Sequence, residues 1–249
     1  MYYLLQENNS MSFEMNDNYI STDMFAADAP VSERATFITR TYLHLLGAIA
    51  AFVGIEALLI QSSVAEPLIG MMVGARYSWL IVLGLFVGVS WIADMWAQSA
   101  TSKFMQYMGL TLYVVAEAVV FLPLLYIASN FYPQAIPMAA GSTAALVVLL
   151  TAVVFITRKD FSFLRPIVLF GGLAAFGAIV VGIIFGFTLG PIFTYAMIAF
   201  ACIAVLYDTS NILHSYRTDQ YVGASLALFA SVALLFWYIL RLFIALDRN

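Results

Sequence analysis

Long apolar runs separated by short polar stretches set the pattern of this 249-residue chain. A helix needs about 20 predominantly apolar residues to cross the hydrocarbon core of a bilayer. Seven runs come close to that length, and their short connections predict a compact antiparallel bundle without an extramembrane domain. The fold class is therefore all-α, a polytopic membrane protein with a seven-transmembrane-helix bundle. The predicted spans are 37–60, 79–97, 105–127, 135–157, 164–186, 190–213 and 222–245.

The composition agrees with this class. Hydrophobic residues make up 63% of the chain and charged residues 10%, whereas an ordinary soluble domain carries about 25% charged residues. The lipid bilayer is therefore the first partner to expect. The single cysteine, Cys202, excludes an intramolecular disulfide, and a metal centre is not expected because the only two histidines are far apart in sequence. No cofactor is expected, and the net charge of −4 argues against nucleic acid as a partner.

Residues 1–33 differ from the rest of the chain because they hold six acidic residues, no Lys or Arg, and no long apolar run. They have neither the basic start nor the apolar stretch of a secretory signal. This composition predicts a mobile cytoplasmic tail, followed by one membrane domain at 34–249. The tail is interpreted as an unstructured leader, with a handle for a partner as the alternative.

The basic residues predict the orientation, because short cytoplasmic loops collect Lys and Arg. On the seven-span topology, seven of the ten basic residues lie on the N-terminal side of the membrane and three on the other. This asymmetry places the N-terminus in the cytoplasm and the C-terminus outside. The first group is Arg34, Arg40, Lys103, Arg158, Lys159, Arg165 and Arg217, and the second is Arg76, Arg241 and Arg248.

Glycine spacing indicates where helices approach closely. Gly84 and Gly88 in the second span, and Gly182 and Gly186 in the fifth, each form a GxxxG spacing. Three further glycines in the fifth span suggest that this helix is buried among its neighbours. They are Gly171, Gly172 and Gly177.

Few ionisable residues occur within or beside the spans. Glu56 lies close to a membrane face, where it is expected to snorkel or to pair with Arg76. Asp94 lies near the end of the second span, where a structural role beside the headgroups is expected.

Glu117 sits about twelve residues into the third span, near the middle of the hydrocarbon. Its carboxyl group must be protonated, paired or wetted by an internal cavity. The helical repeat places Tyr113 and Phe121 on the same face, which predicts an aromatic-lined pocket. A transport role and a structural hydrogen bond from a neutral carboxyl group both remain open.

The segment ACIAVLYDTSNIL at Ala201–Leu213 places Asp208 inside the sixth span, with Asn211 one turn further on the same face. An ionised carboxylate in hydrocarbon costs at least about 2.5 kcal/mol, so Asp208 should face protein or water. Ser231 lies at a matching depth in the seventh span. If the two helices are neighbours, the Ser231 hydroxyl can donate to Asp208. With no cation adjacent in sequence, burial makes the charge of this carboxyl group responsive to pH.

Three segments resemble the Bax-inhibitor, or transmembrane Bax-inhibitor motif, family, and in particular its bacterial inner-membrane branch. They are TRKDFSFL at Thr157–Leu164, LYDTSNILH at Leu206–His214 and YILRLF at Tyr238–Phe243. The seven spans and Glu117 within VVAEAVVFLP are also similar, so the resemblance covers about residues 36–245. It implies an inner-membrane location.

The resemblance further implies that aspartates in the sixth and seventh helices share a proton. In the family, as the resemblance implies, this pair of aspartates latches a cytoplasmic gate and governs a pH-dependent calcium leak. Asp208 matches the first aspartate, but the second position, ten residues before Arg241, is Ser231. The chain therefore lacks the two-carboxylate latch, and an aspartate beside a serine is a single titrating site. Ion passage or pH sensing is assigned to Asp208, Glu117, Ser231 and Asn211, and support of the latch to Arg241 and Tyr207.

Resemblance to the bacterial branch also implies a second role, because members of that branch bind and restrain the ATP-dependent protease of the inner membrane. An acidic N-terminal tail in the cytoplasm would suit binding by such a protease. Enzymatic functions are not expected, because the chain lacks the catalytic groups that each of them needs. The GxGD of an intramembrane aspartyl protease is absent from the seventh span, and a lone aspartate cannot act as both acid and base. Gly223 and Ser225 lack a convincing histidine base, and the last span lacks the lysine that retinal needs. Two classes remain: a stress-related regulator with a cation leak, and a non-conducting protease modulator.

Overall fold

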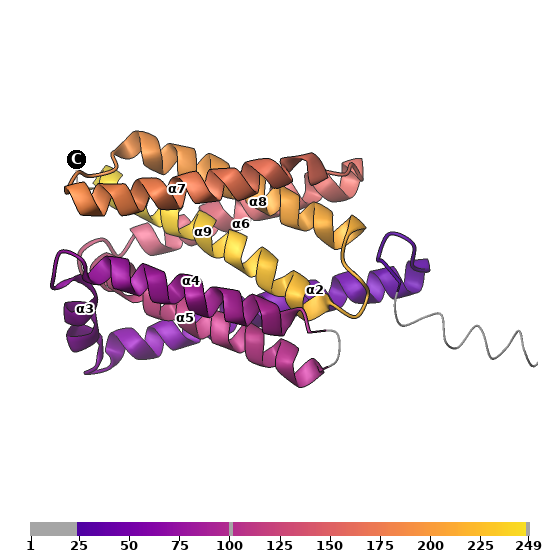
Figure 1. Cartoon of the computed structure of the whole chain (residues 1–249), viewed down its shortest axis with the longest axis horizontal. Coiled ribbons are helices and arrows are strands. Elements are labelled where there is room, and N and C mark those ends of the chain that lie inside the picture. Colours follow the sequence, from indigo (N-terminus) through magenta and orange to yellow (C-terminus); the bar gives the residue numbers. More distant parts are fainter. Residues whose placement is uncertain (1–23, 100–101, 248–249) are drawn as a thin grey trace, which may run out of the picture.

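The computed structural model describes residues 24–99 and 102–247, and these form an antiparallel bundle of helices (Figure 1). Seven of the helices in this part of the chain are long and apolar enough to cross a membrane, as predicted. Most of the predicted acidic tail, residues 1–23, lies outside the described residues. The elements are α2 (Val31–Gln61), α3 (Ala65–Val73), α4 (Ser78–Ala97), α5 (Lys103–Phe131), α6 (Ala135–Thr157), η1 (Ser162–Leu164), α7 (Arg165–Phe185), α8 (Pro191–His214) and α9 (Tyr221–Asp247).

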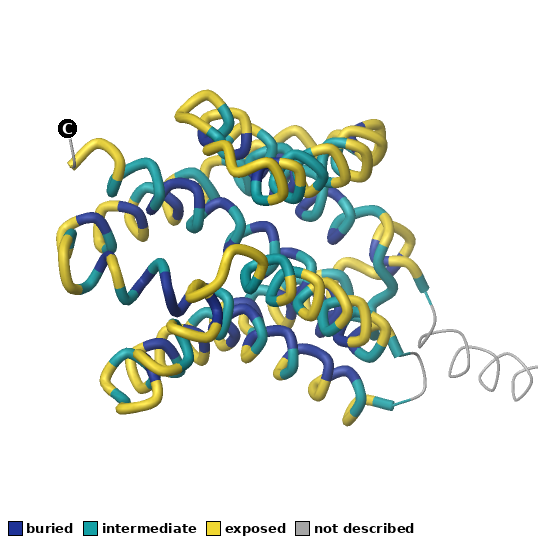
Figure 2. The backbone as a smooth tube through the Cα atoms, turned by 60° about the vertical axis from the view of Figure 1, so that its left-hand side comes forward, coloured by how far each residue is buried: buried dark blue, intermediate teal, exposed yellow. Residues whose placement is uncertain are grey.

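The last helix, α9, occupies the centre of the bundle. It contacts α2, α4 and α5 on one side and α6 and α8 on the other, and it crosses between these two groups in Figure 1. Its buried residues therefore occur on every face of the helix, as expected for a helix surrounded by others. Leu228, Leu235 and Leu240 are fully buried. The outer faces of the peripheral helices are exposed (Figure 2), which suits contact with lipid.

Small residues allow α4, α5 and α9 to approach one another closely. A Cβ atom on Gly109 of α5 would lie 2.4 Å from the Ala93 carbonyl oxygen and 2.5 Å from the Ala97 nitrogen of α4. A Cβ atom on Gly223 of α9 would lie 3.0 Å from the Ala97 carbonyl oxygen. Because lipid tails are as apolar as helix surfaces, such close van der Waals packing stabilises helix association in membranes.

The predicted GxxxG contacts are wrong. A Cβ atom on Gly84 or Gly88 would meet nothing within 4 Å, so these glycines face no neighbouring helix. Gly186 instead ends α7 with a φ of 78°, in the left-handed region that glycine favours.

The prediction that the fifth span is buried is also wrong. Gly182 is the one buried residue of α7, and α7 packs mainly on α8 and on the η1 turn. Its glycines therefore lie on a peripheral helix whose surface is largely available to lipid.

The connection between the first two spans holds a short helix, α3, that the sequence pattern did not predict. The chain before α2 is also ordered from residue 24, inside the predicted tail, and α2 begins at Val31, three residues before the predicted domain boundary. The first membrane-spanning helix therefore begins three residues before the predicted boundary.

Replacing Gly109 with alanine should lower the free energy of unfolding by about 1–3 kcal/mol, because the added methyl group must displace the backbone of α4. Gly84→Ala is the matched control and should be close to neutral, since its methyl group meets open space. Thermal unfolding of the purified variants in detergent measures both. Equal midpoints for the two variants would contradict the close approach of α4 and α5.

Candidate functional site

Asp208 on α8 and Ser231 on α9 face each other inside the bundle. The Ser231 hydroxyl donates a hydrogen bond to Asp208 Oδ2, as the matching depths of the two residues predicted. Ser231 is buried and the Asp208 residue is half-buried. The short loop at 215–220 makes α8 and α9 antiparallel neighbours, which is why two residues 23 positions apart meet. A carboxyl group deep in the sixth span is thereby kept away from lipid.

A second carboxyl group, on Asp94 of α4, faces the same region. Burial raises the pKa of the Tyr216 phenol, and the charges of Asp208 and Asp94 raise it further. The structural role predicted for Asp94 beside the headgroups stays a prediction, since the residue is half-buried in the last turn of α4. Its carboxylate also accepts a hydrogen bond from its neighbour Gln98 at 2.7 Å.

A hydrogen bond attaches the chain after α6 to the last turns of α8. The Phe161 backbone N–H donates to Ser210 Oγ at 2.9 Å, and within α8 His214 Nδ1 lies 3.0 Å from the Ser210 carbonyl oxygen. These contacts explain why the TRKDFSFL and LYDTSNILH segments, far apart in sequence, form one unit. They fix the end of α8 that carries Asp208.

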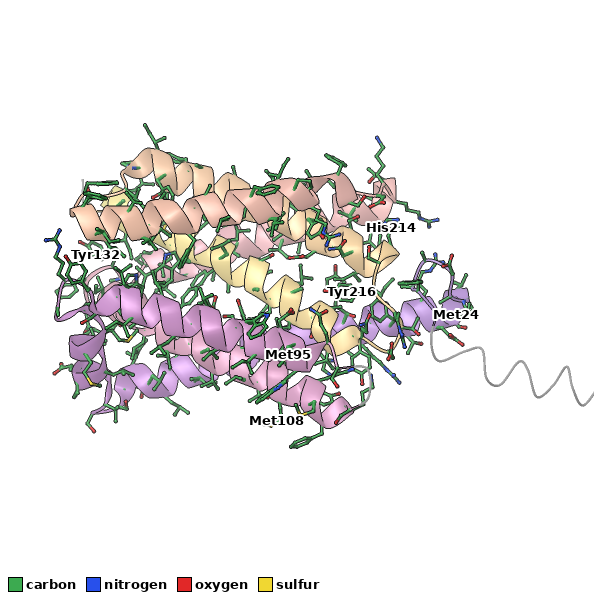
Figure 3. The ribbon with its side chains drawn as sticks, in the orientation of Figure 1. Met24, Met95, Met108, Tyr132, His214 and Tyr216 are labelled. Atoms are coloured by element: carbon green, nitrogen blue, oxygen red, sulfur yellow. The ribbon has the colours of Figure 1, made fainter. Side chains whose placement is uncertain are left out.

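The segment Met24–Pro30 is docked on the loop between α8 and α9. The Ala26 N–H donates to the Tyr216 carbonyl oxygen at 2.8 Å, and the Thr218 N–H donates to the Met24 carbonyl oxygen at 3.2 Å. Met24 and Tyr216 accordingly lie at the same end of the bundle in Figure 3. Arg34 holds the segment in place, since its Nε donates to the Ala26 carbonyl oxygen at 2.7 Å.

Glu117 lies further along the bundle axis, beside a cavity of about 550 Å³ between α4, α5, α7 and α9. The residue is 6% exposed, and its Oε2 atom has no hydrogen-bond partner among the described residues. Phe121 lines the cavity, and Trp79 and Trp237 on its wall stack with centroids 6.4 Å apart. The predicted aromatic-lined pocket beside Glu117 is therefore present.

The structure does not bring the other predicted site residues to Asp208. Arg241 follows Ser231 by ten residues, about 15 Å along the helix, and donates to the Leu189 carbonyl oxygen at 3.2 Å. It lines the cavity beside Glu117 instead. Asn211 accepts a hydrogen bond from the Ser215 hydroxyl at 3.4 Å. Tyr207 is half-buried and lies near enough to Tyr216 to interact electrostatically.

Glu56 is buried almost completely, as Glu117 is. It is 4% exposed, and neither of its carboxylate oxygens has a hydrogen-bond partner within residues 24–99 and 102–247. The prediction that Glu56 snorkels or pairs with Arg76 is wrong, because Arg76 donates to the Ile184 carbonyl oxygen at 2.7 Å. Among the residues that the structure describes, no group of three or more His, Cys, Asp or Glu is placed to hold a metal ion.

Comparison with known proteins identifies the family. Residues 34–248 match the family model described as "Inhibitor of apoptosis-promoting Bax1". The chain belongs to the Bax-inhibitor family. The family match spans the predicted membrane domain almost from end to end, and the resemblance of the three motifs is confirmed.

Curated relatives of this Bax-inhibitor protein occur in plants and bacteria. Protein LIFEGUARD 2 of Arabidopsis thaliana is 29% identical over 153 residues, which are 50% of this chain and 61% of the relative. An uncharacterized protein of Pseudomonas aeruginosa, PA2604, is 28% identical over 149 residues, 59% of this chain and 64% of the relative. The match thus spans less than two thirds of the length of each. An uncharacterized protein of Pasteurella multocida, PM0402, is 26% identical over 205 residues, 78% of this chain and 83% of the relative.

Arg34→Met should loosen the docked Met24–Pro30 segment of this Bax-inhibitor protein without unfolding the bundle, because methionine keeps the packing volume but donates no hydrogen bond. We expect exchange of the Ala26 and Thr218 amide hydrogens to become about tenfold faster, as the loss of roughly 1.4 kcal/mol implies. Hydrogen exchange followed by mass spectrometry measures this. Arg158→Met, at an exposed residue, is the control; equal exchange in both variants would show that Arg34 does not anchor the segment.

Proposed function

We propose that this protein is a stress-related regulator of the cell inner membrane that passes cations, calcium among them, through its helix bundle in a pH-sensitive manner. The observation that carries the proposal is the Ser231–Asp208 hydrogen bond inside the bundle. Glu117, beside the cavity on the other side of Tyr113, supplies a second carboxyl group on the same route. The proposal assigns the protein no catalytic chemistry.

The pH sensitivity follows from the bond between α8 and α9. An ionised Asp208 accepts a charge-assisted hydrogen bond from Ser231, and this bond is about twice as strong as one between neutral groups. Protonation of Asp208 removes that charge and weakens the tie between the two helices. The charge of Asp208 also contributes to raising the pKa of the Tyr216 phenol in the loop after α8, and Asp94 of α4 contributes to the same shift.

The proposed orientation places the Asp208 region on the cytoplasmic side. Basic residues gather near it at the N-terminal end of the bundle: Lys103 Nζ lies 4.5 Å and the Arg40 guanidinium 5.5 Å from the centroid of the Tyr221 ring. Lys103 also donates to the Asp219 carbonyl oxygen. This grouping supports a cytoplasmic N-terminus by the positive-inside rule. The end of the cavity that holds Arg76 and Arg241 then lies toward the outer side.

Neutralising either carboxyl group should change the leak. In vesicles loaded with a calcium-sensitive dye, we expect the wild-type flux to differ between pH 6 and pH 8. Asp208→Asn should remove most of this difference, because the group that titrates between α8 and α9 is gone. Glu117→Gln should lower the flux severalfold at both values, because a cation on this route loses a carboxylate partner.

Asp247→Asn is the matched control, since it neutralises an exposed acid at the end of α9 and should leave the flux unchanged. An unchanged flux at both pH values in Asp208→Asn and in Glu117→Gln would remove the channel proposal.

A non-conducting modulator of the membrane-bound ATP-dependent protease is the second candidate. The docking of Met24–Pro30 on the loop between α8 and α9 favours it. The docked segment follows directly in sequence on the acidic residues of the predicted tail, and it lies at the end of the bundle where basic residues gather. A protease partner that grips this tail would pull directly on the loop that follows Asp208.

Deleting residues 1–23 tests this candidate and leaves the docked segment in place. If the tail is the handle, co-purification with the protease should fall at least about tenfold, and turnover of the protein should slow. The control exchanges Glu7, Glu14 and Asp17 for their amides and keeps the length of the tail. Unaltered association and turnover after the deletion would remove the main support for this role.

A further inference from the structure

Two arginines share the cavity that lies between α4 and α7. Arg76 enters it from the turn before α4, and Arg241 from α9. Arg76 donates to the Ile184 carbonyl oxygen in the last turn of α7, and Arg241 donates to the Leu189 carbonyl oxygen in the loop that follows. The two guanidinium groups therefore converge on the C-terminal end of α7 and the short loop after it.

Neither guanidinium group forms an ion pair with any of the residues that the structure describes. A guanidinium group carries five N–H donors, and each of these arginines uses one of its terminal nitrogens on a backbone carbonyl. The remaining donors have the geometry that binds a phosphate or carboxylate group with two hydrogen bonds. Two such groups at one end of a cavity form a site for an anion.

Apart from Glu117 and Thr188, most of the remaining lining of the cavity is apolar or aromatic. Its walls include Leu83 and Phe86 of α4 and Ile179 and Ile183 of α7. The helix α7 packs on α8 and η1, whereas α4 packs on α5, α9 and α3. The cavity lies between these two helices, which are not in close contact with each other, and residues of α9, which runs between them in Figure 1, complete its lining.

The depth of the arginines matches that of lipid headgroups. Trp79 and Trp237 stack beside them, and the Arg76 guanidinium lies 5.5 Å from the centroid of the Tyr77 ring. Tryptophan and tyrosine are enriched where the hydrocarbon meets the headgroups. If the arginines bind an anionic phospholipid headgroup, the acyl chain attached to it lies at the depth of the apolar cavity walls.

We propose that this cavity binds one anionic phospholipid, with its phosphate on Arg76 and Arg241 and an acyl chain between α4 and α7. The charge of the two arginines matches the headgroup, and the apolar walls match the chain. A soluble anion would use the first feature but not the second. The site does not depend on cation flux, so it stands or falls separately from the proposed leak.

Native mass spectrometry of the full-length protein in detergent tests the proposal. With phosphatidylglycerol and phosphatidylcholine of identical acyl chains, we expect one retained phosphatidylglycerol and at least about tenfold weaker retention of phosphatidylcholine. Arg76→Gln combined with Arg241→Gln should abolish this preference. Arg158→Gln combined with Lys159→Gln removes two exposed charges outside the cavity and should preserve it.

A steric pair of variants keeps the test decisive if the double arginine variant does not fold. Leu83 lines the cavity, so Leu83→Trp fills it and should displace the lipid. Leu85, two residues away, is 66% exposed and does not line the cavity, so Leu85→Trp should leave lipid retention unchanged. Equal retention of the two lipids by the wild type would overturn the proposal. A thermal shift with inorganic phosphate as large as that with phosphatidylglycerol would also overturn it, in favour of a soluble anion.

Discussion

Hydrocarbon offers no hydrogen bond to a carboxyl group, and this constraint arranges the helices of the bundle. Asp208, Glu117 and Glu56 all lie within segments long and apolar enough to span the membrane, and Glu117 and Glu56 are almost fully buried. Each therefore fixes which face of its helix points inward. For Asp208, the hydrogen bond from the Ser231 hydroxyl also fixes the register of α8 against α9.

The central position of α9 follows from the same constraint. It supplies Ser231 to the Asp208 region and Arg241 to the cavity beside Glu117. One helix thus contributes polar groups to both ends of the bundle, while Leu228 and Leu235 fill its contacts in between. Close packing of Gly109 and Gly223 on α4 holds this arrangement without any hydrophobic driving force between the helices.

Sequence reasoning succeeded where properties that can be counted along the chain, such as span length and hydropathy, decide the structure. Span length and hydropathy predicted the seven helices, and counting depth across the short 215–220 loop predicted the contact between Asp208 and Ser231. It failed where the partner lies on a helix that is not adjacent in sequence. Glu56 was paired with Arg76 because nothing in the sequence around Arg76 shows that its guanidinium group reaches the Ile184 carbonyl oxygen of α7.

The glycines show the same limit. GxxxG spacing at Gly84 and Gly88 marks a smooth helix face but not what covers it, and here no neighbouring side chain lies within 4 Å of either glycine's Cβ position. The glycine that matters most for packing, Gly109, stands alone in its helix. Its partner is the pair Ala93 and Ala97, so the small-residue spacing is on the opposite helix.

In the proposed leak, Tyr113 is the residue that would close the route between Asp208 and Glu117. The residue is buried on α5, one helical turn before Glu117. Its ring packs against Phe229 of α9 at 6.1 Å and against Phe86 of α4 at 5.9 Å between centroids. The three rings therefore form one aromatic layer across α4, α5 and α9. Under the proposal, a cation would pass only if α9 shifted and carried Phe229 away from Tyr113, and the Ser231–Asp208 bond, two residues further along α9, would oppose that shift. The link between α8 and α9 and the aromatic layer would then be parts of one closed state.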